Sequence, residues 1–404
     1  MDETKKTSKT KIKTVKEGLV EIAIPEFEKI SSKAPVFYNP KMEFNRDISI
    51  LALQRFQEEI KKSVDICDLF GGSGIRAIRY KKELKNVGKV SVNDISDQAI
   101  EFEKINSENN NMNLNLHQKE ANVLLREFRG KFDIVDVDPF GTPSYFIDSL
   151  GYSVKKNSMV CITATDTSAL CGTYIEPCVR KYNAKPNKTE YCHETGIRIL
   201  IGFVALTFGK YKKYLEPKLT HSSQHYMRLY LKVKKSSKGT DESLNENIGY
   251  IEHCSKCLYR KSIKGLATDI DNKCPECGEK LTIAGPLWAG EVQDQKFIDG
   301  MIHELLFKNL RTSKKILKLL TTCSEEANSP ITFYDIHKIS KVLKVSAPKL
   351  SEVQETLKKE GFSATRTHFS PLGIKTECDI NILKKIVYDL STDSKNDFNY
   401  KKIL

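Results

Sequence analysis

An apolar run that ends in an acid and a proline constrains the fold of this chain most. Residues 132–141 read FDIVDVDPFG, and their branched aliphatic side chains predict a short buried strand. Proline cannot continue a central strand, so the chain must leave the sheet near Pro139. Asp138 and Phe140 are therefore expected at the carboxyl end of a strand, where open α/β sheets bind ligands. A plain Asp-Pro turn is the alternative interpretation.

Strand and helix patterns alternate along the first half of the chain. Residues 64–76 (VDICDLFGGSGIR) predict a strand, a glycine-rich turn and the start of a helix, and a helix through Ile60 is expected before them. Such alternation implies right-handed crossovers and a mainly parallel sheet, so both turns should open on one sheet edge. The other predicted strands are 89–94, 114–117, 159–166 and the half-buried 227–233.

The glycine-rich turn is a candidate cofactor site. Gly71, Gly72 and Gly74 let the backbone bend sharply and approach a ligand closely. The turn departs from the dinucleotide-binding pattern and resembles the D-x-F/A-x-G-x-G turn of methyltransferases that use S-adenosylmethionine. Asp94 ends the second strand, where a carboxylate can accept hydrogen bonds from both hydroxyls of a ribose. Alternatively, Asp94 caps the helix that follows it.

The charge balance indicates the kind of partner. The chain carries 65 Lys and Arg against 52 Asp and Glu, a net charge of +13. This favours a polyanion, nucleic acid first and a membrane surface second, although a lysine-rich solubilising surface has the same composition. No apolar run reaches the ~18–20 residues that span a bilayer. The longest run, 197–208, is expected to be a buried helix.

Four of the 11 cysteines form a spaced set, Cys254-x2-Cys257 and Cys274-x2-Cys277. Paired thiolates at this spacing close a tetrahedral zinc site on two knuckles. Four thiolates leave no open coordination position, so the zinc is expected to be structural. Disulfides are the alternative. Without a secretory signal, the odd cysteine count indicates a reducing compartment, and we expect a cytoplasmic protein.

Changes in composition predict the domains. Residues 1–17 are polar and lysine-rich and are expected to form a flexible basic arm. Residues 18–235 are the predicted α/β domain, and residues 236–248, poor in apolar side chains, are expected to be a linker or loop. Residues 249–404 are the predicted smaller α+β domain, with a zinc ribbon at about 250–284.

The last domain shows helical patterns with basic side chains. A long helical stretch is expected at 295–322, and residues 334–343, 348–361 and 362–369 read as helix, helix and wing-like strand. A winged-helix-like nucleic-acid module and a solvated helical domain are both compatible with this order. The basic face of such a module would contain Lys338, Lys341, Lys344, Lys349, Arg366 and His368.

A set of motifs in fixed order resembles one enzyme family. The motifs are Pro35-Val36-Phe37-Tyr38-Asn39-Pro40, Asn45-Arg46-Asp47, Gly72-Ser73-Gly74-Ile75-Arg76, Asp138-Pro139-Phe140-Gly141, Thr163-Ala164-Thr165-Asp166, Gly285-Pro286-Leu287-Trp288, Thr367-His368-Phe369 and the cysteine quartet. Together they are similar to the tRNA (guanine-26, N2)-dimethyltransferases in their compact archaeal-type form. The likeness runs from about Gly18 to the C-terminal region.

The resemblance implies a Rossmann-like methyltransferase domain followed by a tRNA-binding C-terminal domain that carries the zinc. The implied cofactor is S-adenosylmethionine. The residues implied to lie near it are Arg46, Asp68, Gly72, Gly74, Arg76, Asp94, Ile95, Glu120 and Ala121.

The resemblance also implies the reaction. One methyl group and then a second would pass to the N2 amine of guanine 26 in tRNA, with the base flipped out of its stack. Phe37 and Phe140 would sandwich the guanine, and Asp138 would receive its amine, whereas the residues alone favour Phe37 as a buried plug. We expect tRNA as partner, no membrane and no obligate protein partner.

Two other classes of function stay open. One is an adenine-N6 methyltransferase on DNA or RNA, whose related motif usually has two prolines; here Phe140 replaces one of them. The other is a zinc-containing RNA-binding protein without activity. The intact Asp138 and the intact glycine-rich turn argue against it.

Overall fold

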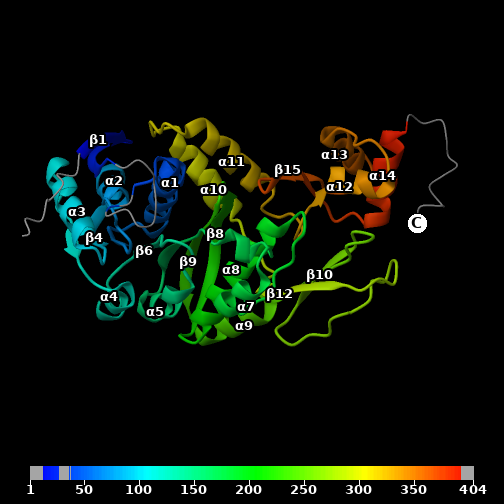
Figure 1. The fold of residues 1–404 in the computed structure, drawn as a ribbon, viewed down its shortest axis with the longest axis horizontal. Coiled ribbons are helices and arrows are strands. Elements are labelled where there is room, and N and C mark those ends of the chain that lie inside the picture. Colours follow the sequence, from blue (N-terminus) through cyan, green and yellow to red (C-terminus); the bar gives the residue numbers. More distant parts are fainter. Residues whose placement is uncertain (1–11, 27–35, 37, 393–404) are drawn as a thin grey trace, which may run out of the picture.

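A seven-stranded mixed sheet organises the computed structural model, which describes residues 12–26, 36 and 38–392 (Figure 1). The strand order is β5-β4-β3-β6-β7-β9-β8. Within the described residues, β9 is antiparallel to the other six strands, which are parallel to one another. The strands are β3 (Val64–Asp68), β4 (Val87–Asn93), β5 (Asn115–His117), β6 (Ile134–Val137), β7 (Ser158–Ala164), β8 (Lys213–Ser223) and β9 (Tyr226–Lys235). The predicted strands are confirmed, and the carboxyl ends of the parallel strands β3 to β7 meet on one edge.

The two faces of the sheet bury separate apolar clusters. Alternate residues of one strand face opposite sides, so Ile134 enters one cluster and Val135 the other. The helices packed with Ile134 are α1 (Glu43–Ile60), α2 (Ile75–Glu83), α10 (Gln295–Leu305) and α11 (Ser313–Glu325). Those packed with Val135 are α4 (Ala121–Glu127), α5 (Ile147–Ser153) and α8 (Cys192–Gly209). The α1 bounds confirm the helix predicted to end at Ile60.

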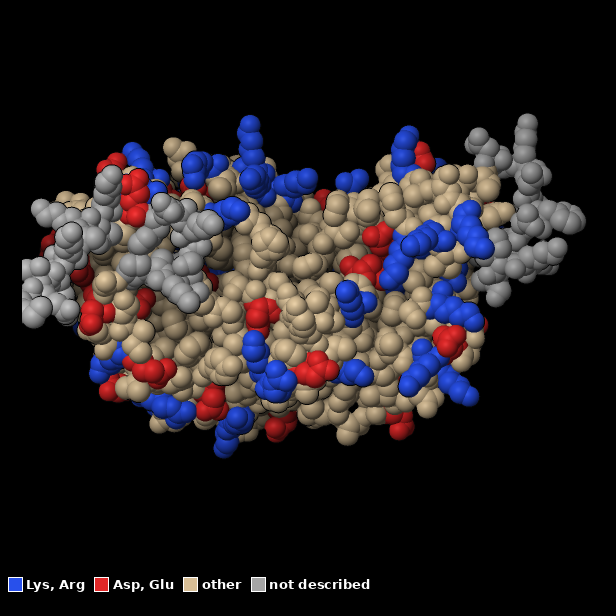
Figure 2. Space-filling view, in the orientation of Figure 1, with Lys and Arg blue, Asp and Glu red and all other residues tan. Residues whose placement is uncertain are grey.

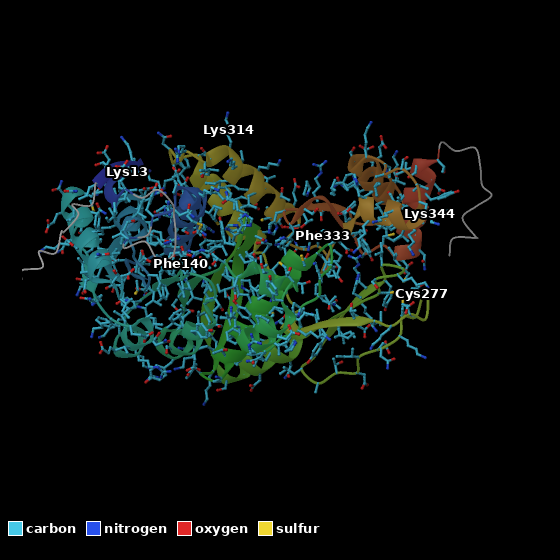
Figure 3. All side chains as sticks on the ribbon, in the orientation of Figure 1. Lys13, Phe140, Cys277, Lys314, Phe333 and Lys344 are labelled. Atoms are coloured by element: carbon cyan, nitrogen blue, oxygen red, sulfur yellow. The ribbon has the colours of Figure 1, made fainter. Side chains whose placement is uncertain are left out.

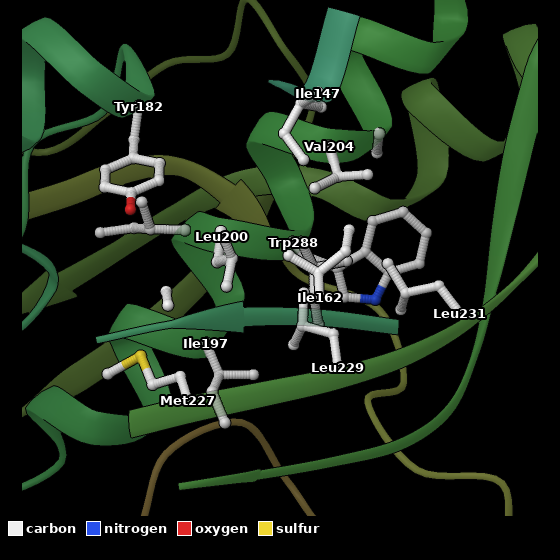
Figure 4. Close-up of a cluster of buried hydrophobic side chains, with 14 of the residues drawn as sticks. Ile147, Ile162, Tyr182, Ile197, Leu200, Val204, Met227, Leu229, Leu231 and Trp288 are labelled. Atoms are coloured by element: carbon white, nitrogen blue, oxygen red, sulfur yellow. The ribbon is translucent and has the colours of Figure 1, made fainter. Parts of the chain in front are cut away.

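The predicted buried helix at 197–208 lies within α8. Its apolar side chains pack against β7 and β9, and Trp288 of β12 (Thr282–Trp288) joins them (Figure 4). A Cβ at Gly202 would lie only 3.0 Å from backbone atoms of Leu287, so glycine permits this close contact between helix and strand. None of the helices in the described part of the chain is long and apolar enough to cross a membrane.

The N-terminal arm is shorter than predicted. Strands β1 (Ile12–Glu17) and β2 (Val20–Pro25) form an antiparallel hairpin. The hairpin is ordered because three alternate residues of β2 are buried and because Asn106 of α3 (Asp97–Asn109) hydrogen-bonds both the N–H and the carbonyl of Ala23. The prediction of a flexible arm over 1–17 is therefore wrong from Ile12 onward. Residues 1–11 lie outside the described residues.

The predicted loop at 236–248 is wrong, because these residues form helix α9 (Ser237–Asn247). The Ser236 side chain caps the helix by accepting a hydrogen bond from the Gly239 N–H at 3.2 Å. The helix lies on the surface and buries only Thr240. It therefore lacks the apolar periodicity that reveals a helix in a sequence.

The C-terminal half begins with a three-stranded ribbon. It contains β10 (Ile248–His253), β11 (Arg260–Lys264) and β12 in the order β11-β10-β12. The helical stretch predicted as one at 295–322 is divided into α10 and α11. Both helices pack in the apolar cluster of α1 and α2, so the chain returns to the sheet before its last module begins.

The last module has its own apolar cluster. It consists of α12 (Ile336–Leu343), α13 (Leu350–Lys359), α14 (Ile380–Ser391) and the strands β13 (Tyr334–Asp335), β14 (Thr365–Thr367) and β15 (Ser370–Lys375). The predicted order of helix, helix and wing-like strand is confirmed. The prediction that His368 belongs to the exposed basic face is wrong. Its side chain is buried in an ion pair with Glu326. Its aromatic neighbour Phe369 stacks on Phe333, which draws this turn inward.

A buried ion cluster joins this module to α8. Glu194 pairs with Lys375 of β15 at 2.9 Å and with Arg198 one turn along α8 at 2.9 Å. Arg198 also donates to the backbone carbonyl of Trp288 at 3.1 Å. Burial alone would raise the pKa of Glu194, but Lys375 and Arg198 lower it to about 2. Glu194 and Arg198 together therefore join α8, the ribbon and the last module.

Glu194→Gln should destabilise the protein by about 3–5 kcal/mol, because it leaves two buried cations without their counter-charge. The measurement is chemical denaturation followed by fluorescence of Trp288. The difference from the parent protein should be full above the ordinary carboxyl pKa of 4.5 and shrink as pH falls towards about 2. Glu325→Gln, at an exposed position, is the matched control. Equal stability of both variants would show that the cluster does not hold the module.

Candidate active site

The glycine-rich turn after β3 approaches α3 too closely for any side chain. A Cβ at Gly71 would stand 2.2 Å from Oε1 of Glu103 and 2.3 Å from a methyl group of Val92. Gly72 and Gly74 have φ of 55° and 77°, which favours glycine. The turn closes with a hydrogen bond of 2.8 Å from the Gly74 N–H to the Gly71 carbonyl. Helix α2 begins directly after it.

Asp94 fastens this turn and does not cap a helix. Its carboxylate accepts hydrogen bonds from the backbone N–H groups of Gly72 and Ser96, both at 3.0 Å. Ser96, whose side chain accepts from the Ala99 N–H, is the N-cap of α3. The alternative role of Asp94 as a helix cap is therefore wrong, and its carboxylate faces the glycine turn.

Two more acids are buried against the turn. Burial raises the pKa of Asp68 to about 7, while Arg76 acts in the opposite direction. Burial and the neighbouring carboxylates of Asp94 and Asp68 raise the pKa of Glu103 to about 9. Neither oxygen of Glu103 has a hydrogen-bond partner among the described residues. Sequence reasoning missed Glu103, although it lies on the helix face of the buried Ala99 and Asn106.

The other predicted cofactor residues stand along the same edge. Ile95 follows β4 with 71% of its surface exposed. Glu120 lies after β5 and caps α4 by accepting from the Val123 N–H at 3.1 Å, and Ala121 is buried behind it. The edge thus offers an exposed apolar side chain beside an exposed carboxylate.

The Asp138–Gly141 turn leaves the sheet at the end of β6, as predicted. The Gly141 N–H donates to Oγ1 of Thr165 at 2.8 Å, and the Thr165 N–H donates to the Gly141 carbonyl at 2.8 Å. This two-point contact with the residue that follows β7 fixes the turn. It leaves the Phe140 ring 55% exposed at the sheet edge (Figure 3). Phe37 lies outside the described residues.

Arg76 holds the carboxylate of Asp138 in place. The two form an ion pair in which the Asp138 side chain is 18% exposed and that of Arg76 only 6%. Asn45 of α1 accepts from the same guanidinium at 3.1 Å. Arg76, predicted to contact a cofactor, therefore also orients the acid at the sheet edge.

A fully buried charge network supports Arg76. Asp136 of β6 accepts from Arg228 of β9 at 2.6 and 2.9 Å and from Tyr80 at 2.6 Å, and it lies 3.6 Å from Arg76. Burial alone would raise the pKa of Asp136, but the two arginines hold it below its ordinary value. Sequence reasoning missed this network, although an acid inside an apolar strand and an arginine inside β9 were visible signals.

Arg46 is engaged by the N-terminal hairpin. It donates to both carboxylate oxygens of Glu17 at 2.6 Å and to the Asn39 carbonyl at 3.1 Å. The same guanidinium lies over the Tyr38 ring, with its carbon atom 5.4 Å from the centre of that ring. Arg46 thus ties β1 to the segment that precedes α1.

The four predicted metal ligands converge in the ribbon. Cys254 and Cys277 have their sulfur atoms 3.5 Å apart, and those of Cys257 and Cys274 lie 3.4 Å apart. All four sulfurs lie within 4.8 Å of one another. Cys277 and Phe140 lie far apart along the long axis of the molecule (Figure 3). The cluster therefore stands outside the sheet-edge site.

Comparison with known proteins gives one family over nearly the whole chain. The family model described as N2,N2-dimethylguanosine tRNA methyltransferase matches residues 18–388. A tRNA (guanine(26)-N(2))-dimethyltransferase of Methanobrevibacter smithii is 61% identical over 385 residues, 95% of this chain and 99% of that protein. The one from Methanothermobacter thermautotrophicus is 48% identical over 377 residues, 93% and 99% of the two chains.

A solved structure agrees in fold. Trm1 from Pyrococcus horikoshii in complex with S-adenosyl-L-methionine superposes with a TM-score of 0.84 at 33% sequence identity. The match covers 93% of this chain and 99% of that one. The sheet, the ribbon and the last module thus occur together in a related protein.

Thr165→Val should loosen the turn that carries Phe140, because it removes the hydroxyl that accepts the Gly141 N–H and keeps the shape of the side chain. Loss of one hydrogen bond should speed hydrogen exchange of this amide about fivefold. Mass spectrometry of a peptide covering residues 138–145 would measure it. Thr173→Val, at an exposed threonine, is the control. Unchanged exchange in Thr165→Val would show that the backbone contact alone fixes the turn.

Proposed function

The chain belongs to the N2,N2-dimethylguanosine tRNA methyltransferase family, and from that premise we propose how its residues carry out the reaction. It is a methyltransferase that acts on N2 of guanine 26 in tRNA with S-adenosylmethionine as methyl donor. The observation that carries the assignment of roles is the position of Asp138 and Phe140. Both stand at the sheet edge onto which the Gly71–Gly74 turn also opens.

The residues around the glycine turn fit S-adenosylmethionine. The cofactor carries a sulfonium and an ammonium group, and Asp68, Asp94 and Glu103 place three carboxyl groups around the turn. Burial, together with neighbouring carboxylates, raises the pKa values of Asp68 and Glu103, and a cationic ligand at the turn would favour their ionised forms. When bound, the cofactor supplies the electrophilic methyl group.

We assign the remaining cofactor contacts along the sheet edge. Gly72 and Gly74 admit the ligand close to the backbone, Asp94 accepts from the ribose hydroxyls, and Ile95, Glu120 and Ala121 border the adenine. Arg46 and Arg76 shape the same site through their acid partners Glu17 and Asp138.

Asp138 is the proposed catalytic acid–base group. The lone pair of the guanine N2 amine is delocalised into the ring, which makes it a poor nucleophile. A carboxylate that accepts one N–H favours the pyramidal amine, stabilises its developing positive charge and then accepts the proton. Arg76 fixes the direction in which the carboxylate points. After the first transfer one N–H remains, so Asp138 can act a second time.

The aromatic residues hold the target base. We propose that the exposed Phe140 ring stacks on one face of the flipped guanine and Phe37 on the other. Stacking is worth about 1–3 kcal/mol per base, which offsets the cost of extruding the base from tRNA.

The basic surface is the proposed tRNA-binding face. Lysine and arginine side chains gather along α11 and over the last module (Figure 2). Beside α11, a groove of about 570 Å³ is lined by Lys41, Arg311, Lys314 and Lys315. On the last module Lys341, Lys344, Lys349 and Arg366 are exposed, whereas Lys338 is partly shielded by an ion pair with Glu190. Contacts to phosphates at both places would grip the substrate independently of its sequence.

The four ribbon cysteines are proposed to hold one structural zinc ion. Their sulfurs already converge without a disulfide, and four thiolates complete a tetrahedral site. We place the protein in the cytoplasm, where such thiols stay reduced and tRNA is available.

Asp138→Asn should lower methyl transfer by about 10²–10⁴-fold, because the amide cannot accept the proton. The assay incubates unmodified tRNA with S-adenosylmethionine and identifies the digested nucleosides by mass spectrometry. Dimethylguanosine should form with the parent protein and vanish when guanine 26 is replaced by adenine. Melting temperature and cofactor affinity should stay near those of the parent.

Asp241→Asn, on the exposed side of α9, is the control and should be fully active. Near-normal turnover of Asp138→Asn would remove Asp138 from the mechanism. N6-methyladenosine in the digest would instead favour the adenine methyltransferase alternative.

Asp94→Ala should weaken S-adenosylmethionine binding by about 1–3 kcal/mol, since the ribose hydroxyls and the Gly72 N–H both lose a charged acceptor. Isothermal titration calorimetry measures this directly. Asp97→Ala is the matched control, because Asp97 lies in the first turn of α3 and is exposed. Equal affinities of the two variants would show that Asp94 supports the turn and does not contact the cofactor.

A further inference from the structure

A second set of soft ligands converges away from the ribbon. Cys171 follows the short helix α6 (Thr167–Leu170), and Cys192 and His193 form the start of α8. The Cys171 sulfur lies 3.6 Å from Nδ1 of His193. All three ligand atoms lie within 4.8 Å of one another. Cys171 thus joins a thiol and an imidazole that lie 21 and 22 positions further along the chain.

The spacing suits a tetrahedral metal ion. Bonds of about 2.3 Å to sulfur and about 2.0 Å to nitrogen hold those two ligand atoms about 3.5 Å apart. The distance between Cys171 and His193 is close to this value. It also resembles the separations of 3.4 and 3.5 Å in the ribbon quartet.

β8 offers an oxygen atom as the fourth ligand. The Ser222 hydroxyl lies 3.2 Å from the same Nδ1 atom of His193. It therefore lies close enough to this nitrogen atom to bind the same ion. Ser222, or a water molecule beside it, would complete four-coordination.

Two of the three ligands reach solvent, whereas Cys171 is buried with only 8% of its surface exposed. Cys67, Cys161 and Cys178 are fully buried in the core. Cys192 and His193 are only half-buried, so an ion can reach them from solvent. Cys192 is the first residue of α8, and a helix N-terminus favours the thiolate that binds metals.

We propose that Cys171, Cys192 and His193 form a second zinc site, separate from the ribbon quartet. The ion would join the α6 turn, the start of α8 and β8. Because Thr165, which fastens the Phe140 turn, lies six residues before Cys171, the ion would brace the segment that supports the base-binding side of the active site. The ligand is a divalent, thiophilic cation, and the inference does not depend on the proposed catalytic roles.

The test counts metal in the full chain and in three variants of it. The parent protein, Cys192→Ser, Cys274→Ser and Cys178→Ser are loaded with zinc, dialysed and analysed by mass spectrometry. About two ions per chain are expected in the parent and in Cys178→Ser, and about one in each of the other two. Cys178→Ser is the matched control, because this buried cysteine of α7 (Ile175–Tyr182) is outside both clusters.

Cobalt substitution keeps the test decisive if Cys192→Ser does not fold. In Cys274→Ser the remaining cobalt should give a tetrahedral spectrum with weaker thiolate charge-transfer bands than the ribbon site, because two sulfurs replace four. A single ion lost by Cys192→Ser and kept by Cys274→Ser would support this site and contradict the ribbon zinc. A single ion that Cys274→Ser loses, with no tetrahedral cobalt spectrum left, would overturn the proposal.

Discussion

The buried pairing of Asp136 with Arg228 and Arg76 is the interaction on which the active edge depends. An ionised carboxylate in a central strand costs several kcal/mol to bury unless cations surround it. Here β9 supplies one cation and α2 the other, so three elements must assemble before the charge is tolerated. The guanidinium of Arg76 then also donates to Asn45 and pairs with Asp138. The carboxylate of Asp138, which we propose as the catalytic group, is thereby positioned by the core.

Features determined by local patterns could be predicted from the sequence. The end of β6 follows from Pro139, and the cysteine cluster follows from its spacing. Features that need a distant partner could not. The α9 segment has no apolar stripe because it buries a single residue, and His368 reads as an exposed base until Glu326 is seen beside it.

In the candidate site, too, residues set by local patterns were predicted, and residues set by distant partners were not. The glycine turn and Asp94 were recognisable because their residue types are required by backbone geometry and by ligand chemistry. Arg76 and Arg46 were assigned to the cofactor, yet each also pairs with a carboxylate of the chain itself. Glu103 escaped attention because a helix residue shows in the sequence neither its burial nor the absence of a partner. Ion pairs between distant segments leave no periodic signal.

The ion cluster around Glu194 has a consequence for how position 26 is found. It fixes the last module against α8, and that module lies far from Phe140 along the long axis of the molecule (Figure 3). With the joint rigid, the span between the proposed phosphate-binding surface and the proposed base pocket is constant. Such a molecule would work as a ruler: it would select a nucleotide by its distance from the bound part of the tRNA, whatever the surrounding bases.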